Sequence, residues 1–421
     1  MRNKRLVLKI SELPSIAVAL VVTFYFVING FTISGLLQVS AFMIIAAFAV
    51  LSYKSSHLHA SLVVWLLSLL PFLWCVNTWT VANIRDFVAY FAFVVFVLFG
   101  TKKINSYDKA INIIFLMAFF HLVFLIINIL FRDSFNNFLY STFASKAMPN
   151  LNKAISGNYY TGLGYIPGDT SGYFVDGLII LFCTKSKNNE HMFAPKTILL
   201  AMGVLFCAKK SHILCLVLSL LLVWLLNAKG GKRVSRVVLA IVSIMGVAII
   251  GYAILPALSG IPMVNRISVA LDSFLAGQDF TSNRTALTSY ALQMFSQNHV
   301  WGIGWKYFNS FTYNRWGWSN YVNNIYIQLL AETGIVGMVL FVFPMLITLV
   351  RTIKAFGISR NMENQQINQK LMLSLGIQFF FLLYGIFEIP FYDYTFLFVY
   401  AISVCLANSA ICEINTYSEE K

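Results

Sequence analysis

Apolar stretches separated by short polar connectors fill almost the whole sequence. Because roughly 20 helical residues cross the hydrocarbon core of a bilayer, apolar stretches of about 17 to 25 residues predict transmembrane helices. We expect about twelve of them, and therefore an all-α integral membrane protein with a single polytopic domain over residues 1–421. The predicted spans are residues 13–29, 33–53, 60–76, 86–100, 110–131, 171–184, 192–208, 211–228, 234–255, 334–350, 371–387 and 392–412.

Two connectors, residues 132–170 and 256–333, are much longer than the others, and the second includes a predicted amphipathic helix. Both are rich in aromatic residues, Gly and Asn, as in "GNYYTGLGYIPGDTSGY" and "WGIGWKYFNSFTYNRWGWSNY". Long loops in compact proteins are usually functional or disordered, and disorder goes with few aromatic residues. Aromatic rings with amides suit the faces and hydroxyls of sugars, so we interpret the loops as a binding surface. The alternative for any single ring is an aromatic belt at the membrane interface.

The Lys and Arg residues predict the orientation, since positively charged connectors stay in the cytoplasm. The connectors "GTKKINSYDK", "KSKNNEH", "AKGGKR" and "RTIKAFGISR" fall on the same side as the basic N-terminus. With twelve spans, 20 of the 30 basic residues lie on that side and 10 on the other. We therefore expect both termini in the cytoplasm and both long loops outside it.

The composition excludes several classes of protein. With 59% hydrophobic residues, 11% charged residues and a mean hydropathy of +0.75, the chain does not fit a soluble domain. The net charge of +14 follows from the orientation, so we expect no nucleic-acid partner. The six Cys residues show no CxxC pair and no paired Cys/His spacing, which argues against disulfides and a zinc site. The sequence also holds no Walker loop and no dinucleotide-binding turn, which gives no support for nucleotide-driven transport. Residues of metal-ligand types do not cluster along the sequence, so we expect no metal and no cofactor.

The connector "AKKSHIL" contradicts the rule for positive charge. Lys209 and Lys210 lie between two predicted helices, in a connector of a few residues on the outer side. Short connectors are expected to obey the rule, so two lysines there are costly unless they meet an anion. That anion is either a lipid phosphate or a substrate diphosphate.

The stretch "NNIYIQLLAETGIVG" begins at Asn323 and precedes an apolar span. A helix from there to Val350 is about 42 Å long at 1.5 Å per residue and overshoots the hydrocarbon core, so its first turns are expected outside the membrane. Its polar residues Asn324, Gln328 and Glu332 are spaced four apart and form one stripe. Two glycines that follow, Gly334 and Gly337, allow a bend or close packing at the bilayer surface.

These segments resemble a known superfamily. "SNRTALTSYALQMFSQNHVWGIGWKYF" followed by "NNIYIQLLAETGIVGMVLFVF" is similar to the shared core of the O-antigen polymerases (Wzy-type) and O-antigen ligases. The resemblance covers about residues 155–350, while the first five spans match only in hydropathy. The matching positions are Arg284, Gly302, Gly304, Phe308, Asn324, Tyr326, Ala331, Glu332, Gly334 and Gly337.

Two positions depart from the superfamily pattern. Lys210 stands where arginine is usual, and Asn323 stands where the histidine before the Asn is expected. An amide cannot accept a proton at neutral pH, which argues against a ligase mechanism that depends on this histidine.

The resemblance implies a GT-C-like membrane glycosyltransferase in the bacterial inner membrane, with its active face in the periplasm. It would polymerise undecaprenyl-diphosphate-linked repeat units into O-antigen or a related surface polysaccharide, in contact with membrane lipid and a chain-length regulator protein. One alternative is an O-antigen ligase that joins the glycan to lipid A-core. Another is a flippase or transporter for lipid-linked oligosaccharides, which needs polar groups buried in the membrane; His121 and Asp176 are the main ones here.

The candidate catalytic residues are Arg284, Lys210 and Glu332. A diphosphate leaving group needs cations for its developing charge, and arginine can contact it in a bidentate way. Glu332 is the best-placed carboxylate to orient or deprotonate an acceptor hydroxyl, although a structural ion pair or helix cap is the alternative. The candidate substrate-binding residues are Lys209, Arg266, Asn323, Asn324, Tyr326, Lys153, Asp169, Trp305 and Arg315.

Overall fold

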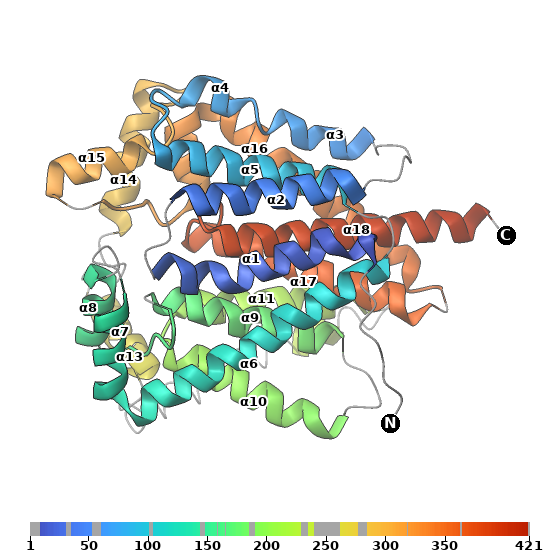
Figure 1. Ribbon diagram of the computed structural model, residues 1–421, viewed down its shortest axis with the longest axis horizontal. Helices are drawn as coiled ribbons and strands as arrows, with labels where there is room; N and C mark the ends of the chain where they lie inside the picture. Colours follow the sequence, from blue (N-terminus) through green and yellow to red (C-terminus); the bar gives the residue numbers. More distant parts are fainter. Residues whose placement is uncertain are drawn as a thin grey trace.

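The computed structural model describes residues 9–30, 35–52, 60–100, 104–143, 148–157, 159–164, 166–184, 190–228, 235–239, 262–276, 284–317, 319–362 and 364–419. These residues form helices and no strand (Figure 1). The longer helices of the first half are α1 (Leu13–Gly30), α2 (Gly35–Ser52), α5 (Val81–Phe99), α6 (Asp108–Leu130), α9 (Pro167–Cys183) and α10 (Glu190–Phe206). Those of the second half are α11 (Lys210–Leu226), α16 (Ile325–Ser359), α17 (Gln365–Phe387) and α18 (Tyr394–Glu419).

The helices coincide with the predicted spans, and the chain is a multi-pass membrane protein. Among the described residues, five helices are long and apolar enough to cross a membrane: Val81–Phe99, Asn105–Leu130, Ile325–Ser359, Gln365–Phe387 and Tyr394–Tyr417. The other predicted spans contain shorter helices, except residues 234–255, which lie mostly outside the described part of the chain. The number of twelve spans therefore stays a prediction.

The predicted span 60–76 differs, because it is broken into α3 (Ala60–Leu67) and α4 (Pro71–Cys75). Pro71 occupies the first turn of α4, where its missing N–H costs nothing, but it cannot continue a helix from the preceding residues. The turn between them is closed by hydrogen bonds from Ser68 N to Trp65 O (3.2 Å) and from Leu69 N to Leu66 O (3.1 Å).

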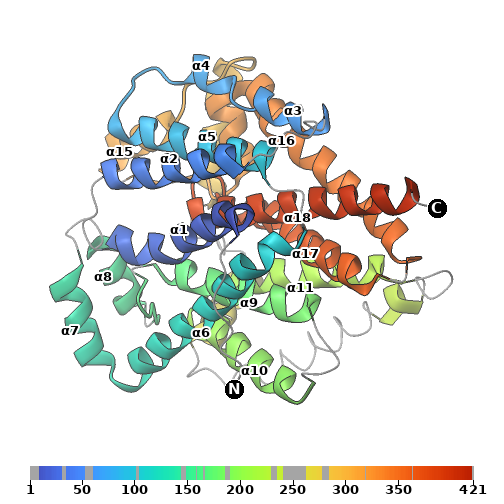
Figure 2. The ribbon, with the colours of Figure 1, turned by 45° about the vertical axis from the view of Figure 1, so that its right-hand side comes forward.

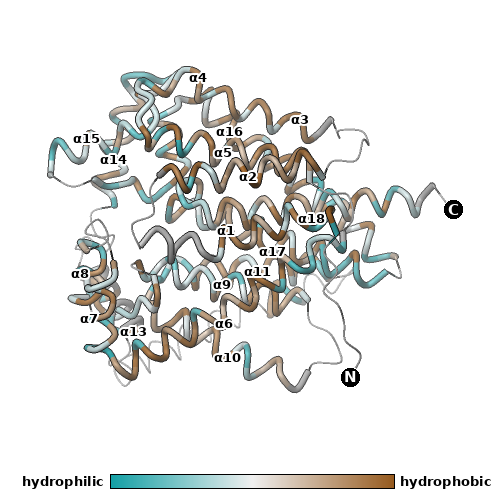
Figure 3. Tube along the Cα trace, in the orientation of Figure 1, coloured by the Kyte–Doolittle hydropathy of each residue, from teal (hydrophilic) through white to brown (hydrophobic). Residues whose placement is uncertain are grey.

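The long helices lie side by side, with α17 and α18 in the middle of the bundle (Figures 1 and 2). Helix α18 packs against α1, α5, α16 and α17, and 83% of its membrane-spanning window is buried inside the protein. Hydrophobic residues follow the middle of the helices, and hydrophilic residues gather in α14 (Arg284–Gln297), in α15 (Tyr307–Trp316) and near the C-terminal end of α18 (Figure 3).

Both long loops lie at the same end of the bundle. The first holds α7 (Arg132–Thr142) and α8 (Met148–Ser156), and the second holds α13 (Pro262–Leu275), α14 and α15. In Figure 1 these helices are on the left, whereas α18 ends on the right. Which end faces the periplasm stays a prediction.

Helix α16 bends at Gly334, which is one of the two arrangements that the glycines were expected to allow. The backbone angles of Gly334 (φ 70°, ψ −175°) are not helical, and the helix resumes beyond it. The helix begins with Asn324, whose side chain accepts hydrogen bonds from Tyr326 N and Ile327 N at 3.1 Å each. This is an N-cap, which satisfies backbone donors that a helix start leaves unpaired.

The residues around the G-x-G turn, His299 to Gly304, pack across this bend. The bend frees carbonyl and N–H groups of α16, and the loop pairs with them through Ile303 N to Ala331 O (3.0 Å), Gly304 N to Glu332 O (2.9 Å) and Ile335 N to His299 O (2.9 Å). The approach requires glycine on both sides, because a Cβ atom would lie 2.1 Å from Val300 O at Gly334 and 2.4 Å from Glu332 O at Gly302.

The same loop corrects one expectation about the polar stripe. The stripe was expected on a helix whose first turns stand at the membrane surface, but Gln328 and Glu332 are completely buried. They face the interior because the G-x-G loop and the α17–α18 connector pack over this side of α16.

Candidate functional site

The short connector between α17 and α18, residues Glu388–Asp393, lies at the end of the bundle that carries the long loops. It is tied to the start of α16 by a hydrogen bond from Ile325 N to Glu388 O (3.1 Å). Polar side chains from α5, α11, α14 and α16 meet on it and form two clusters.

The Glu388 cluster consists of Lys209, Arg284 and Glu388. Lys209 Nζ lies 2.6 Å and Arg284 Nη2 3.0 Å from the same carboxylate oxygen, Glu388 Oε1. Arg284 Nη1 also donates to the carbonyl of Phe387 at 2.8 Å. The cation side chains are 25% and 38% exposed and the carboxylate 10%, so the cations form the outer part of the cluster and carry one excess positive charge.

Local structure favours an anion at this point. Lys209 is the N-cap of α11, and Arg284 is the first residue of α14. A helix start carries a partial positive charge, so two cations at two helix starts are favourable only around an anion. The Lys209 side chain reaches the cluster across Gly168, where an added Cβ would lie 3.5 Å from Lys209 Cε.

Two further carboxyl groups, Asp169 and Asp393, lie beside the Glu388 cluster. Burial raises the pKa of Asp393 to about 7, although its carboxylate accepts a hydrogen bond from Thr395 N at 3.0 Å. Burial, and then the charge of Asp393, raise the pKa of Asp169 well above its ordinary value. Near neutral pH the cluster is therefore flanked by carboxyl groups that can hold or release a proton.

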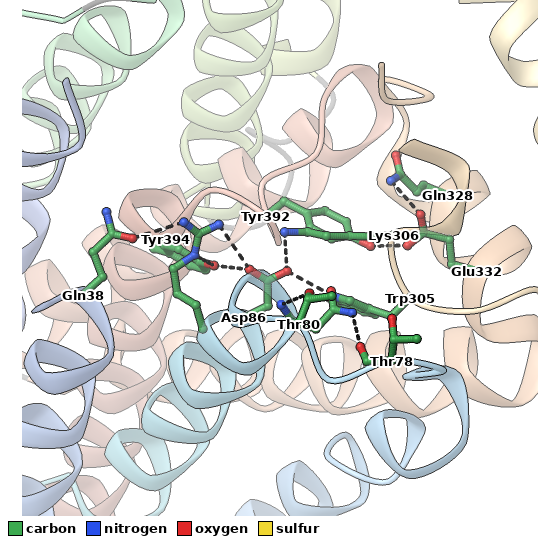
Figure 4. Close-up of polar contacts among 12 residues, drawn as sticks. Gln38, Thr78, Thr80, Asp86, Trp305, Lys306, Gln328, Glu332, Tyr392 and Tyr394 are labelled. Carbon is green, nitrogen blue, oxygen red and sulfur yellow. Dashed lines mark hydrogen bonds and ion pairs between the residues drawn. The ribbon is translucent and has the colours of Figure 1, made fainter. Parts of the chain in front are cut away.

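The Asp86 cluster surrounds a second buried carboxylate (Figure 4). Lys306 Nζ lies 2.6 Å from Asp86 Oδ2, and Trp305 Nε1 donates to the same oxygen at 3.1 Å. Tyr394 OH donates to Asp86 Oδ1, and the Arg85 guanidinium lies 3.8 Å from that oxygen. Like Glu388, Asp86 contacts two cations. Arg85 belongs to α5, and Lys306 follows directly after the G-x-G loop.

Glu332 is buried next to the Asp86 cluster and is held by neutral groups. Gln328 Nε2 donates to Glu332 Oε1 at 3.2 Å, and Tyr392 OH donates to Oε2 (Figure 4). Among the described residues Glu332 forms neither an ion pair nor a helix cap. Tyr392 belongs to the connector that also carries Glu388, so one short segment contacts Glu332 and both clusters.

Residues 197–342 match a protein-family model described as O-antigen ligase. The match confirms the resemblance to the superfamily of O-antigen polymerases and ligases. It covers less than half of the chain, and no curated protein matches the chain. The matched segment contains Lys209, Arg284, Lys306 and Glu332, and it ends before Glu388.

Several residues that the sequence analysis predicted for the site meet at these clusters. Arg284 and Lys209 hold Glu388, with Asp169 beside them. Trp305 and Glu332 lie at or next to the Asp86 cluster, where the Trp305 ring is also 5.0 Å from that of Tyr392.

The other predicted residues have other environments. Asn324 is the cap of α16, and Tyr326 OH donates to Leu382 O at 2.7 Å. Lys153 is exposed in α8, and Arg315 is exposed with its guanidinium 4.9 Å from the Tyr290 ring centre. Asn323 is half-buried and has a φ of 55°. Lys210 is half-buried at the start of α11. Arg266 lies in α13, and its side chain is outside the described part of the structure.

Sequence reasoning missed Glu388 and Asp86, the two carboxylates at the cluster centres. A signal for Glu388 was present, because the short connector "EIPFYDY" places acidic residues on the same predicted side as the short connector with Lys209. Asp86 had a weaker signal as the first residue of a predicted span, directly after Arg85. Within the described residues no three His, Cys, Asp or Glu side chains are grouped as metal ligands.

Proposed function

We propose that the protein is a GT-C-like glycosyltransferase of the bacterial inner membrane that polymerises undecaprenyl-diphosphate-linked repeat units at the periplasmic face. The observation that supports this most directly is the convergence of Lys209 and Arg284 on one anion position beneath the long loops. Two cations from separate elements suit a diphosphate, and the aromatic loops around them suit sugars.

In the proposed reaction, the growing glycan leaves its carrier diphosphate and joins a hydroxyl of a second carrier-linked unit. The bond between the anomeric carbon and the diphosphate oxygen breaks, and the new glycosidic bond forms to the acceptor oxygen. Lys209 and Arg284 stabilise the charge that develops on the departing diphosphate, so this side needs no general acid.

The acceptor hydroxyl loses a proton during the transfer, and a carboxylate has to take it. Glu332 is one candidate, and its partners Gln328 and Tyr392 fix the direction of its carboxylate. Asp393 is a second candidate, because a pKa of about 7 suits a group that accepts a proton near neutral pH.

The ligase is the second candidate function, and the description of the matching family favours it. Asn323, at the position of the expected histidine, favours the polymerase. A flippase is a third possibility, with His121 and Asp176 as buried polar groups. The ring centres of His121 in α6 and Tyr173 in α9 are 4.1 Å apart, so His121 lies in the α6–α9 interface.

A deletion strain analysed by lipopolysaccharide gel distinguishes the three functions. A core that carries a single repeat unit supports the polymerase. A bare core together with long carrier-linked chains shows a ligase, and a bare core with carrier-linked units trapped in the cytoplasm shows a flippase.

A further inference from the structure

The two cations of the Glu388 cluster lie where phosphate esters compete for them. Lys209 and Arg284 are partly exposed at one end of a membrane-spanning bundle. Phospholipid headgroups are abundant at such a surface, and basic residues near it attract them. An open pair of cations would therefore bind headgroups as well as a carrier diphosphate.

Glu388 fills this position in the unliganded protein. Its Oε1 atom contacts both cations, and its backbone carbonyl is fixed by Ile325 N, so the carboxylate is held in place by the fold. A group on the same chain competes with a high effective concentration. Any phosphate ester that uses Lys209 and Arg284 together has to displace it.

We propose that Glu388 is a resident anion that a diphosphate ester displaces and that keeps membrane phosphodiesters out of the site. This inference rests on the proposed function. A phosphodiester headgroup carries one negative charge, so it only replaces the negative charge of the Glu388 carboxylate that it displaces. A diphosphate offers two phosphate groups, and the cluster has one positive charge to spare. Glu388 thus sets the affinity that any phosphate ester has to exceed before it occupies the site.

The proposal has a quantitative consequence. If only the state with Glu388 displaced binds, the apparent Kd of each ligand is its intrinsic Kd divided by the fraction of that state. The contact therefore weakens all phosphate esters by the same factor. The apparent Kd of weakly bound headgroups then becomes too high for them to occupy the site, whereas a tightly bound diphosphate still binds.

The test uses the full-length protein in detergent micelles and calorimetric titration with two probes. Farnesyl diphosphate represents the carrier, and a short-chain phosphatidylglycerol represents the headgroups. Wild-type protein is expected to bind the first tightly and the second weakly, with a measurable Kd for each. In Glu388→Gln both apparent Kd values should fall by one common factor of about ten or more, the range expected for a lost charge-assisted contact. Unchanged Kd values for both probes overturn the proposal.

Two controls make the result specific. Glu12→Gln is the matched variant, since Glu12 also pairs with a lysine at 2.6 Å, Lys109, but at the start of α6 away from the long loops; it should leave both Kd values unchanged. Glu388→Asp withdraws the carboxylate by one methylene and should tighten binding by a smaller factor, which keeps the test valid when the Gln variant does not fold.

A double variant separates this inference from the proposed function. Lys209→Gln with Arg284→Gln should abolish farnesyl diphosphate binding. Wild-type affinity in the double variant contradicts the diphosphate site of the proposed function. Loss of binding there, combined with unchanged Kd values in Glu388→Gln, contradicts only the role of Glu388.

Discussion

Arg284 donates one hydrogen bond to the Phe387 carbonyl and one to the Glu388 carboxylate, both through its guanidinium fork. A lysine carries the same charge but cannot make both contacts with one planar group. This geometry is why we place Arg284 first among the cations that would hold a diphosphate.

Replacement of Arg284 should affect the transfer step strongly. Arg284→Ala is expected to lower the rate by about 10² to 10³, the range seen when one preorganised transition-state contact is lost. Arg284→Lys should recover part of that loss. The measurement is turnover of a synthetic carrier-linked repeat by purified protein with EDTA present. Full turnover by Arg284→Ala removes this residue from the mechanism, and loss of wild-type turnover in EDTA contradicts the metal-independent reaction.

Asp393 predicts a pH dependence of stability. Its pKa is about 7 in the folded protein because it is buried, whereas an Asp in an unfolded chain titrates near about 4. Its stabilising contribution is therefore complete below pH of about 4 and is lost as the pH rises through about 7. Asp169, whose pKa is also raised by burial, acts in the same direction.

Thermal unfolding in detergent between pH 5 and pH 8 measures this effect. The wild-type midpoint should fall as the pH rises, and Asp393→Asn, which cannot ionise, should reduce that fall. An equal fall in both proteins would show that Asp393 does not carry the effect.

At this scale the sequence predicted the cations better than their partners. Lys209 was recognisable because its charge conflicts with its predicted side of the membrane, and Arg284 because it fits the superfamily pattern. Glu388 was not recognisable, because hydropathy does not show which connectors lie close together in the folded protein. Lys209 and Glu388 lie far apart along the chain, at the start of α11 and just after the end of α17, and the packing of α11 on α17 brings them together.

Among the elements, α16 is the one whose sequence and shape are most closely linked. Its glycines indicated a possible bend at Gly334, whereas Asn324, predicted to bind substrate, is its N-cap, and its contact with the G-x-G loop was not predicted. The direction in which its polar stripe faces could not be predicted from the sequence. Polar residues spaced four apart fit a solvent-facing side of a helix and a side covered by another segment equally well.

Substitution of Gly334 tests the bend. Gly334→Ala places a Cβ atom 2.1 Å from Val300 O at a φ of 70°, and the backbone strain alone costs about 1 to 3 kcal/mol. We expect a lower unfolding temperature and displacement of the G-x-G loop. The matched control is Gly357→Ala in the same helix, where an added Cβ meets nothing within 4 Å. The control should be neutral or stabilising by about 0.5 to 1 kcal/mol. Equal stability of the two variants would refute the tight contact at the bend.

In the whole molecule, two loops far apart in the sequence share one end of the bundle (Figure 1). Apolar run length and the positive charges of the connectors led to the prediction of one shared side for both loops, because both properties depend on the membrane and not on detailed packing. The broken span at Pro71 was missed for the opposite reason, since local backbone chemistry there overrides an apolar run.

Reporter fusions test the orientation. Fusions after Asn150 and after Phe311, one in each long loop, should both report a periplasmic location, and a fusion after Lys232 a cytoplasmic one. A cytoplasmic result for either loop fusion would place the Glu388 cluster or its covering loops on the wrong side for a periplasmic polymerase.

The hydrogen bonds across the bend of α16 also constrain how the protein is made. The carbonyls of Ala331 and Glu332 and the N–H of Ile335 form hydrogen bonds with the segment from His299 to Gly304. Without that segment a straight α16 would pair them internally, since a buried backbone group without a partner is costly. The ribosome synthesises the G-x-G segment first. In the predicted orientation, the second long loop has to cross the membrane before α16 can take its bent form. A translocation defect in that loop should therefore leave α16 inserted but straight.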